Sequence, residues 1–160
     1  MPTLIRKPWV IISASVVGFY GGRRAEIVDE DSKAGNGFLA NVCVQWEDAL
    51  KVAVEAGIRV IKVRFGTVLS KKGEALKKML LPFKLVLGGV FGSGEQYMSW
   101  VSIDDAVAMI QYVMTNDSLQ GPVNFVTPNA LNNCKFTKSL GKVLSRPTIF
   151  PLPAFAACIG

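Results

Sequence analysis

Two serines and a tyrosine follow the first apolar run of the chain, and their hydroxyls could bind a polar group or move a proton. Residues 10–21 read VIISASVVGFYG, with Ser13 and Ser15 after the apolar residues and Tyr20 just before a glycine. Ligands of open α/β sheets lie beyond the carboxyl ends of the strands, where a serine can donate a hydrogen bond to a substrate oxygen. The alternative is that these small residues only allow close packing and a turn.

Alternating strand and helix patterns must position these residues. Apolar and β-branched runs predict strands at residues 10–13, 59–65, 97–101 and 123–127. Helical spacing predicts helices at residues 38–56, 74–87, 103–115 and 133–145, with a further helix from residue 151. Strands that alternate with helices are typical of parallel βαβ units in a three-layer α/β fold.

The helix predicted at residues 38–56 carries an apolar stripe that we expect to face the core. Gly57 follows at the position of a C-terminal cap. Trp46 is the largest member of the stripe, so we expect its side chain to be buried. The residues that recur at helical spacing are Leu39, Val42, Trp46, Leu50 and Ala53.

Composition narrows the class of protein. Half of the 160 residues are hydrophobic, so we expect a folded domain. Histidine is absent, so we expect neither metal chemistry nor Ser-His nucleophilic catalysis. The net charge of +6 fits a solvated surface, and we expect no nucleic-acid partner, because no aromatic residues alternate with the basic ones. We expect no membrane span and no secretory signal, and therefore an intracellular protein, cytoplasmic or organellar, rather than a secreted one.

Three stretches together resemble one enzyme superfamily. They read SASVVGFYG, VRFGTVLSKKG and GGVFGSGEQYMSWVSIDDAV, and they resemble the extended short-chain dehydrogenase/reductase superfamily of NAD-dependent epimerase/dehydratase type. GNGFLANVCVQWE also matches the sugar-nucleotide-epimerase-like branch, which includes homologues linked to plastid and cyanobacterial cell division. The resemblance implies the C-terminal portion of a Rossmann-like, doubly wound, mostly parallel sheet at about residues 10–70. Residues 71–160 would mix Rossmann elements with part of a small substrate domain.

The resemblance also implies a site. In the family, the first of these stretches belongs to a central strand of the Rossmann sheet, and the serine at the end of that strand lies beside the nicotinamide and the reacting carbon. Here this serine would be Ser15, with Ser13 as its neighbour. The loop after the next strand lines the nicotinamide and substrate pocket in relatives. The residues implied at the cofactor are Ser13, Ser15, Arg64, Gly66 and Val68, and those implied at the substrate are Gly92, Gln96 and Trp100.

Catalysis is the first departure from the family. The superfamily uses Tyr-x-x-x-Lys on a helix, where the lysine lowers the pKa of the tyrosine acid/base. Aligning Glu47 with the glutamate of relatives puts Leu39 and Cys43 in those two positions, and a shift by one residue puts Phe38 and Val42 there. Neither pair can do the work of a tyrosine and a lysine. Ser15 and Tyr20 are therefore the candidate catalytic residues, although stacking or packing is the alternative role for Tyr20.

The second departure concerns the cofactor. A Rossmann domain holds the pyrophosphate on a Gly-rich turn between its first strand and helix, and we find no such element. We therefore expect one incomplete domain that lacks the N-terminal dinucleotide-binding half, with NADP or NAD bound only in a complete protein. The expected function is an NAD(P)-binding, epimerase-like oxidoreductase of unknown reaction, acting on a small molecule such as a nucleotide-sugar. The alternative is a non-catalytic binding or regulatory protein on the same fold, such as a division factor; a homo-oligomer is a further expectation.

Overall fold

Two compact units make up the part of the chain that the computed structural model describes, residues 6–148. Within that range the first unit comprises residues 6–66 and 104–126, and the second comprises residues 67–103 and 127–148. The helix predicted from residue 151 lies outside the described residues. No helix in the described range is long and apolar enough to span a bilayer.

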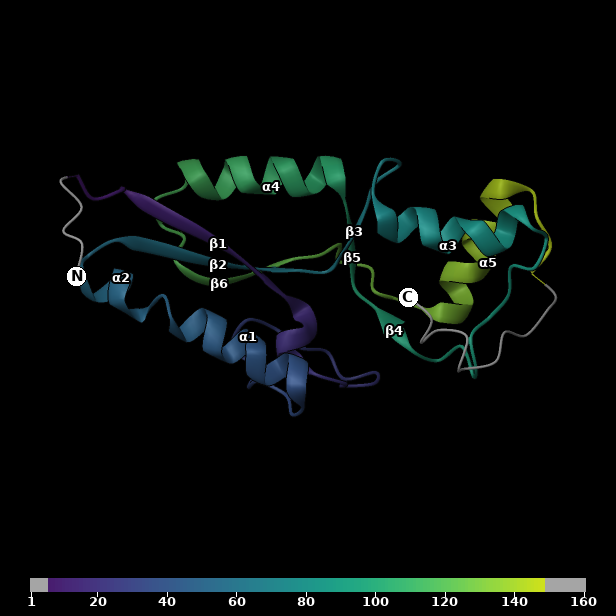
Figure 1. The fold of residues 1–160 in the computed structure, drawn as a ribbon, viewed down its shortest axis with the longest axis horizontal. Coiled ribbons are helices and arrows are strands. Elements are labelled where there is room, and N and C mark those ends of the chain that lie inside the picture. The colour runs from purple at the N-terminus through teal and green to yellow at the C-terminus, as the bar shows by residue number, and fades with distance from the viewer. Residues whose placement is uncertain (1–5, 149–160) are drawn as a thin grey trace. The chain divides into compact units, whose positions relative to one another are not determined.

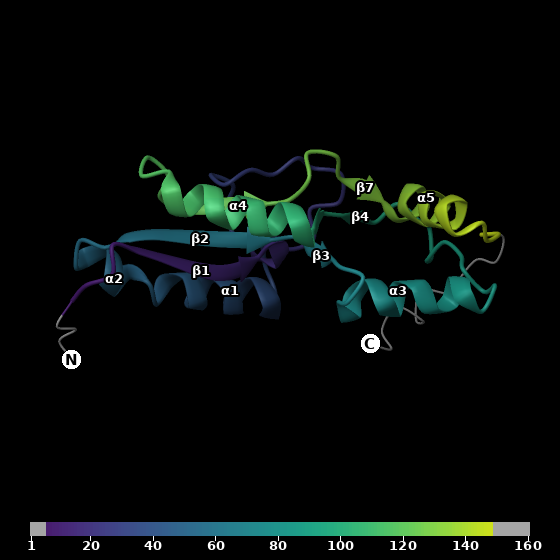
Figure 2. The same ribbon diagram turned by 90° about the horizontal axis from the view of Figure 1, so that it is seen from above.

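A parallel three-stranded sheet forms the centre of the first unit. Its strands are β1 (Val10–Val16), β2 (Arg59–Phe65) and β6 (Gly121–Phe125), in the order β1-β2-β6. The 3-10 turn η1 (Val17–Tyr20) follows β1 directly. Figures 1 and 2 show α4 (Ile103–Thr115) on one face of the sheet and α1 (Phe38–Asp48) on the other. The expected α/β architecture with parallel strands is therefore confirmed.

The face of the sheet beneath α4 holds the apolar core of the first unit. Ile61, Val63 and Phe125 are each fully buried, and Val113 of α4 packs against them. Phe65 meets Phe125 edge to face, with ring centroids 5.2 Å apart. Close packing of β-branched and aromatic side chains on this face provides the hydrophobic stabilisation of the layer.

Arg59 joins the beginning of β2 to the end of α4. Its guanidinium lies 5.2 Å from the centroid of the Trp9 ring and donates to carbonyl groups at the end of the helix. The last carbonyls of a helix have no intrahelical partner, so a cation that binds them stabilises the helix end. The carbonyls that accept from Arg59 belong to Val113, Met114, Asn116 and Leu119.

The helix predicted at residues 38–56 differs from the structure in two ways. It is two helices, α1 and then α2 (Lys51–Glu55), and Gly57 ends α2 with a φ of 77°. The prediction that Trp46 is buried is wrong, since 60% of it is exposed. The exposed and the buried stripes of α1 lie one residue apart: Leu39, Val42 and Trp46 are exposed, whereas Ala40, Cys43 and Glu47 are buried.

Short strand pairs and two helices form the second unit. β3 (Thr67–Leu69) pairs in parallel with β5 (Trp100–Ser102), and β4 (Tyr97–Met98) pairs antiparallel with β7 (Leu131–Asn132). The single strand predicted at residues 97–101 is thus two strands that join different partners. The helices are α3 (Glu74–Lys84), which contains Pro82 in its last turn, and α5 (Asn133–Leu144), which is capped by the Asn132 side chain.

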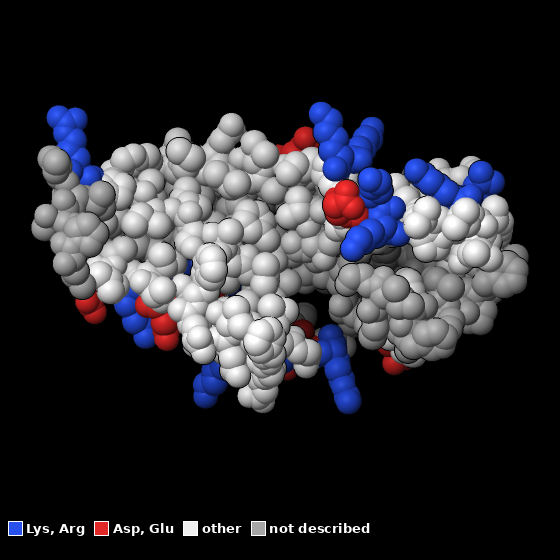
Figure 3. All heavy atoms as spheres, in the orientation of Figure 1, with Lys and Arg blue, Asp and Glu red and all other residues white. Residues whose placement is uncertain are grey.

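Basic side chains gather on the surface of the second unit. Figure 3 shows lysine and arginine side chains over the region of α3 and α5, with few acidic ones among them. Lys77 is paired with Glu74 at 3.6 Å, and both side chains are largely exposed. The exposed basic residues of this unit are Lys71, Lys72, Lys77, Lys78, Lys84, Lys135, Lys138, Lys142 and Arg146.

The exposures of two aromatic residues give the first prediction. Phe125→Ala removes a fully buried side chain and is expected to lower the free energy of unfolding by about 3–5 kcal/mol. Trp46→Ala removes a side chain that is mostly in solvent and is expected to lower it by at most about 1 kcal/mol. Urea unfolding followed by circular dichroism measures both, and equal losses would place Trp46 in the core after all.

Candidate functional site

A buried ion pair lies between α1 and β2. Nε of Arg64 donates to Oε1 of Glu47 and Nη2 donates to Oε2, each at 2.9 Å. Each of the two residues is only 4% exposed. Two parallel N–H···O bonds match the planar guanidinium to the carboxylate, so both side chains have their orientation fixed.

The register of the sheet aligns polar residues on the face toward α1. Ser15 pairs with Arg64 across β1 and β2, and Arg64 pairs with Asn124 across β2 and β6. Each of the three is the last residue but one of its strand. Because parallel strands end at one edge of the sheet, these residues form a polar row near the carboxyl edge, where ligands bind in α/β sheets.

Ser15 is joined to the ion pair. Its Oγ donates to Oε1 of Glu47 at 2.9 Å, and the residue is 9% exposed. Ser13 lies two residues earlier on the same face of β1, and its Oγ accepts a hydrogen bond from Nε1 of Trp46 at 3.3 Å. The structure thus brings both predicted serines to the α1 face, with Ser15 alone in the buried network.

Tyr20 extends the network to β6. Its hydroxyl donates to Oδ1 of Asn124 at 2.7 Å and accepts from Nη1 of Arg64 at 2.9 Å. The Arg64 guanidinium also lies 3.5 Å from the centroid of the Phe19 ring. A tyrosine that is 3% exposed and bonded on both sides holds η1 against the sheet, and its hydroxyl hydrogen is already engaged.

The segment between η1 and α1 closes over this network. Oε1 of Glu30 accepts from the backbone N–H of Asn124 at 2.7 Å, and the carbonyl of Glu30 lies 3.4 Å from Nη1 of Arg64. The N–H of Gly35 donates to the carbonyl of Phe19, and a Cβ at Gly35 would meet the carbonyl oxygen of Tyr20 at 2.2 Å. A glycine is therefore required where this segment passes η1.

The electrostatics favour an ionised pair. Burial alone would raise the pKa of Glu47, but the hydrogen bonds from Arg64 and Ser15 outweigh it and hold that pKa below its ordinary value. Burial would likewise lower the pKa of Arg64, and its bonds with Glu47 and Tyr20 raise it instead. Glu47 thus accepts hydrogen bonds but would be a weak general base in catalysis, because its carboxylate form is the stabilised one.

The remaining predicted residues are divided between the units. Gly66 is buried at the end of β2 and donates its N–H to Phe125, whereas Val68 lies in β3 of the second unit. Gly92 and Gln96 are exposed in the loop before β4, and the carbonyl of Gln96 accepts from Asn133.

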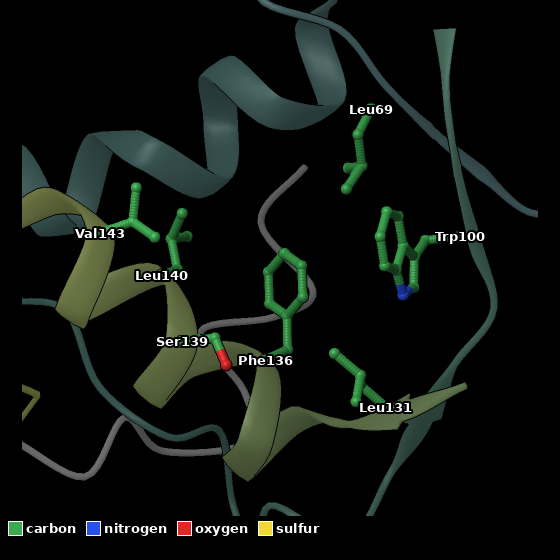
Figure 4. Close-up of a pocket in the computed structure, with 7 residues that line it drawn as sticks. All are labelled: Leu69, Trp100, Leu131, Phe136, Ser139, Leu140 and Val143. Atoms are coloured by element: carbon green, nitrogen blue, oxygen red, sulfur yellow. The ribbon is translucent and has the colours of Figure 1, made fainter. Parts of the chain in front are cut away.

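Trp100, the last predicted residue, lines a hollow of about 210 Å³ in the second unit. Figure 4 shows its indole facing Leu69 and Phe136, and its Nε1 is buried without a hydrogen-bond partner. The lining is apolar apart from Ser139 and comprises Leu69, Trp100, Leu131, Phe136, Ser139, Leu140 and Val143. A surface of this kind suits apolar packing more than the binding of a charged nucleotide.

Known proteins resemble this chain in sequence and in fold. An epimerase family protein of Mycobacterium tuberculosis, MT2273, is 44% identical over 91% of this chain and 48% of its own length. The crystal structure of human epimerase family protein SDR39U1 with NADPH superposes with a TM-score of 0.86 at 31% identity, over 96% of this chain and 52% of the human one. The nucleoside-diphosphate sugar epimerase of Corynebacterium glutamicum matches at 38% identity and a TM-score of 0.75, over 93% and 33%.

The predicted resemblance is confirmed. This chain is related to the epimerase family proteins of the short-chain dehydrogenase/reductase superfamily. It spans about half the length of the curated relatives that it matches. A scan against family models gave no match.

Three members of the buried polar network were missed as site residues from the sequence. Glu47 served only to align the helix, and Asn124 and Glu30 gave no motif signal. Glu47 could have been found, because it shares a helix face with the apolar Ala40, Cys43 and Leu50, whereas the neighbouring Asp48 falls on another face. Asn124 becomes visible only once the register of β2 and β6 is known.

The ion pair predicts how stability depends on pH. The pKa of Glu47 is lowered in the folded chain, so the unfolded chain takes up the proton first as the pH falls. The contribution of Glu47 to the free energy of unfolding therefore begins to fall below about pH 4.3, the pKa of an unperturbed glutamate, and is lost as the pH passes through the folded pKa. Glu47→Gln leaves the buried Arg64 without a counter-charge and with one acceptor fewer, and is expected to cost about 3–5 kcal/mol at pH 7. Urea unfolding from pH 7 to pH 3 should show the two proteins converging toward low pH. A difference in unfolding free energy between the two proteins that stays constant over this pH range would contradict a titrating Glu47.

Tyr20 is expected to be important for stability because its hydroxyl has two buried partners. Tyr20→Phe leaves Oδ1 of Asn124 and Nη1 of Arg64 without one bond each, and is expected to cost about 1–3 kcal/mol. Tyr112→Phe is the matched control, since that tyrosine is 61% exposed, and is expected to change stability by less than about 0.5 kcal/mol. Thermal unfolding of both variants is the measurement, and equal effects would refute the buried role.

Proposed function

We propose that this chain supplies the nicotinamide side of an NAD(P) site in an epimerase-type oxidoreductase. The observation that carries the proposal is the polar row of Ser15, Arg64 and Asn124 at the carboxyl edge of a parallel sheet. Cofactors of Rossmann-type folds bind at this edge. The human relative of the same fold was crystallised with NADPH, which supports the choice of cofactor.

The chemistry of this edge fits one end of a dinucleotide. At the end of β1, Ser15 offers a polar contact on the α1 face, and Val16, 41% exposed, offers an apolar one on the opposite face. Arg64 is not available to bind a phosphate, because Glu47, Tyr20 and Phe19 surround its guanidinium. Among residues 6–148 no short glycine-rich turn leads from a strand straight into a helix, so nothing described suits the pyrophosphate. When bound, the cofactor would supply hydride transfer.

The substrate that we propose is a small molecule of the nucleotide-sugar class. The name of the Corynebacterium glutamicum relative, a nucleoside-diphosphate sugar epimerase, supports this class. Gly92, Gln96 and Trp100 remain the proposed substrate residues, with Gly92 and Gln96 exposed and Trp100 able to offer only an apolar ring.

Calorimetric titration with NADP tests the cofactor assignment. The 160-residue chain alone is expected to bind NADP no more tightly than about 1 mM, because most of the charge of the cofactor lies on the phosphates. Joining the N-terminal half of the Mycobacterium tuberculosis relative to the chain should bring binding into the micromolar range.

The same N-terminal half without this chain is the control and should bind more weakly than the joined form. Micromolar binding by the chain alone would contradict the division of the site. Equal binding by the joined form and the N-terminal half would overturn the proposed function.

A second candidate function is non-catalytic binding or regulation on the same fold. It is favoured by the positions of the proton-transfer pair, where Leu39 is half exposed and Cys43 is buried in α1. Tyr20 cannot replace that pair without breaking its bond to Asn124. Epimerase turnover by the joined form with UDP-glucose would exclude this candidate, whereas NADP binding without turnover would support it.

A further inference from the structure

We infer that Ser15 meets its ligand as a hydrogen-bond acceptor, with Glu47 and Arg64 as the positioning residues that fix its hydroxyl. The inference rests on the proposed function, because it concerns the same edge of the sheet. It reverses the expectation that Ser15 donates to a substrate oxygen. The ligand group at this position must therefore carry an N–H or O–H.

The hydroxyl hydrogen of Ser15 has one acceptor that holds it. Oγ lies 2.9 Å from Oε1 of Glu47, and a carboxylate oxygen cannot donate, so the hydrogen must lie on the serine and point at Glu47. A serine hydroxyl has one hydrogen and two lone pairs. Once the hydrogen is engaged, Oγ has only its lone pairs for a ligand.

Arg64 keeps Glu47 in the acceptor state. Its two bonds to the carboxylate occupy both oxygens, so the carboxylate cannot turn away from Ser15 without losing the fork geometry. Breaking the Ser15 bond would leave a charged oxygen with one donor fewer in a site that is 4% exposed. A ligand that needs Ser15 as a donor would have to overcome this cost.

Ser13 shows the contrast within the same strand. Its Oγ accepts from Trp46, whose side chain is 60% exposed, so its hydroxyl hydrogen is not directed by a buried charge. The two serines of the motif therefore present different chemistry, and only Ser15 is locked.

Two ligand groups at a nicotinamide-side site carry the required hydrogen. One is the carboxamide N–H of the nicotinamide ring, and the other is a hydroxyl of the sugar substrate. A carbonyl or carboxylate oxygen at this position would place its lone pairs against those of the Ser15 Oγ, and this repulsion would disfavour its binding.

The hydroxyl of Ser15 can be observed without any ligand. In an equal mixture of H2O and D2O, the Cβ carbon of a serine gives two NMR signals when its hydroxyl exchanges slowly and one when exchange is fast. We expect two signals for Ser15 and one for Ser13 in the 160-residue chain. A single signal for Ser15 would overturn the inference. Glu47→Asp keeps the charge but shortens the side chain, and should merge the two signals.

Binding to the form joined with the relative's N-terminal half tests the ligand side. In the coenzyme arm, NADP is compared with its 3-acetylpyridine analogue, in which a methyl group replaces the donating NH2. In the sugar arm, UDP-glucose is compared with its 4-keto derivative. We expect about tenfold tighter binding of the donor-bearing member in one arm, which identifies the ligand group.

Variants separate positioning from stability. Ser15→Ala and Glu47→Gln should reduce the tenfold ratio to about one, and Ser15→Thr should restore it, because threonine keeps the hydroxyl. Ile61→Val lowers stability in the core and should leave the ratio unchanged. No discrimination in either arm, or tighter binding of the acceptor-only member, would overturn the inference. Failure of NADP itself to bind would overturn the proposed function and the ligand side with it, while the Ser15 signals still decide the orientation.

Discussion

The buried pair between Glu47 and Arg64 is the constraint on which the first unit depends. Taking a carboxylate and a guanidinium out of water costs several kcal/mol for each ion, and only good geometry with further hydrogen bonds offsets that cost. Here the fork between the two side chains, the hydroxyls of Ser15 and Tyr20 and the ring of Phe19 supply those contacts. Removing any one member leaves a buried charge with fewer partners, so the network holds its parts together as a set.

The rotation of α1 follows from this pair. A helix that buried Trp46, Val42 and Leu39 would turn Glu47 to the side and leave Arg64 alone beneath it. The structure instead buries Glu47 with the small Ala40 and Cys43, which let the helix approach the sheet closely, and leaves the large apolar side chains exposed. Each of these apolar side chains keeps part of its surface covered, so exposing it costs little free energy. An unpaired buried guanidinium would destabilise the fold by more.

The sequence was informative where burial alone decides structure. Residues 59–65 are rich in β-branched residues and form a strand with the predicted bounds, and residues 103–115 form the predicted helix. It was misleading for α1, because periodicity counts apolar residues and takes no account of a single charged partner on another strand. It was silent on Asn124 and Glu30, whose roles arise from register and from a long segment that folds back, neither of which local patterns encode.

The two faces of the sheet therefore have different roles: one mainly provides stability, and the other fixes the orientation of polar groups. Beneath α4 the contacts are apolar and non-directional, so a change of one methyl group alters stability without altering which groups point where. Beneath α1 the contacts are directional, because Arg64 and Ser15 both donate to the carboxylate of Glu47. A rigid apolar layer on one face lets the polar row on the other be held in one arrangement, and it is that arrangement which sets the hydrogen-bonding character of the sheet's carboxyl edge.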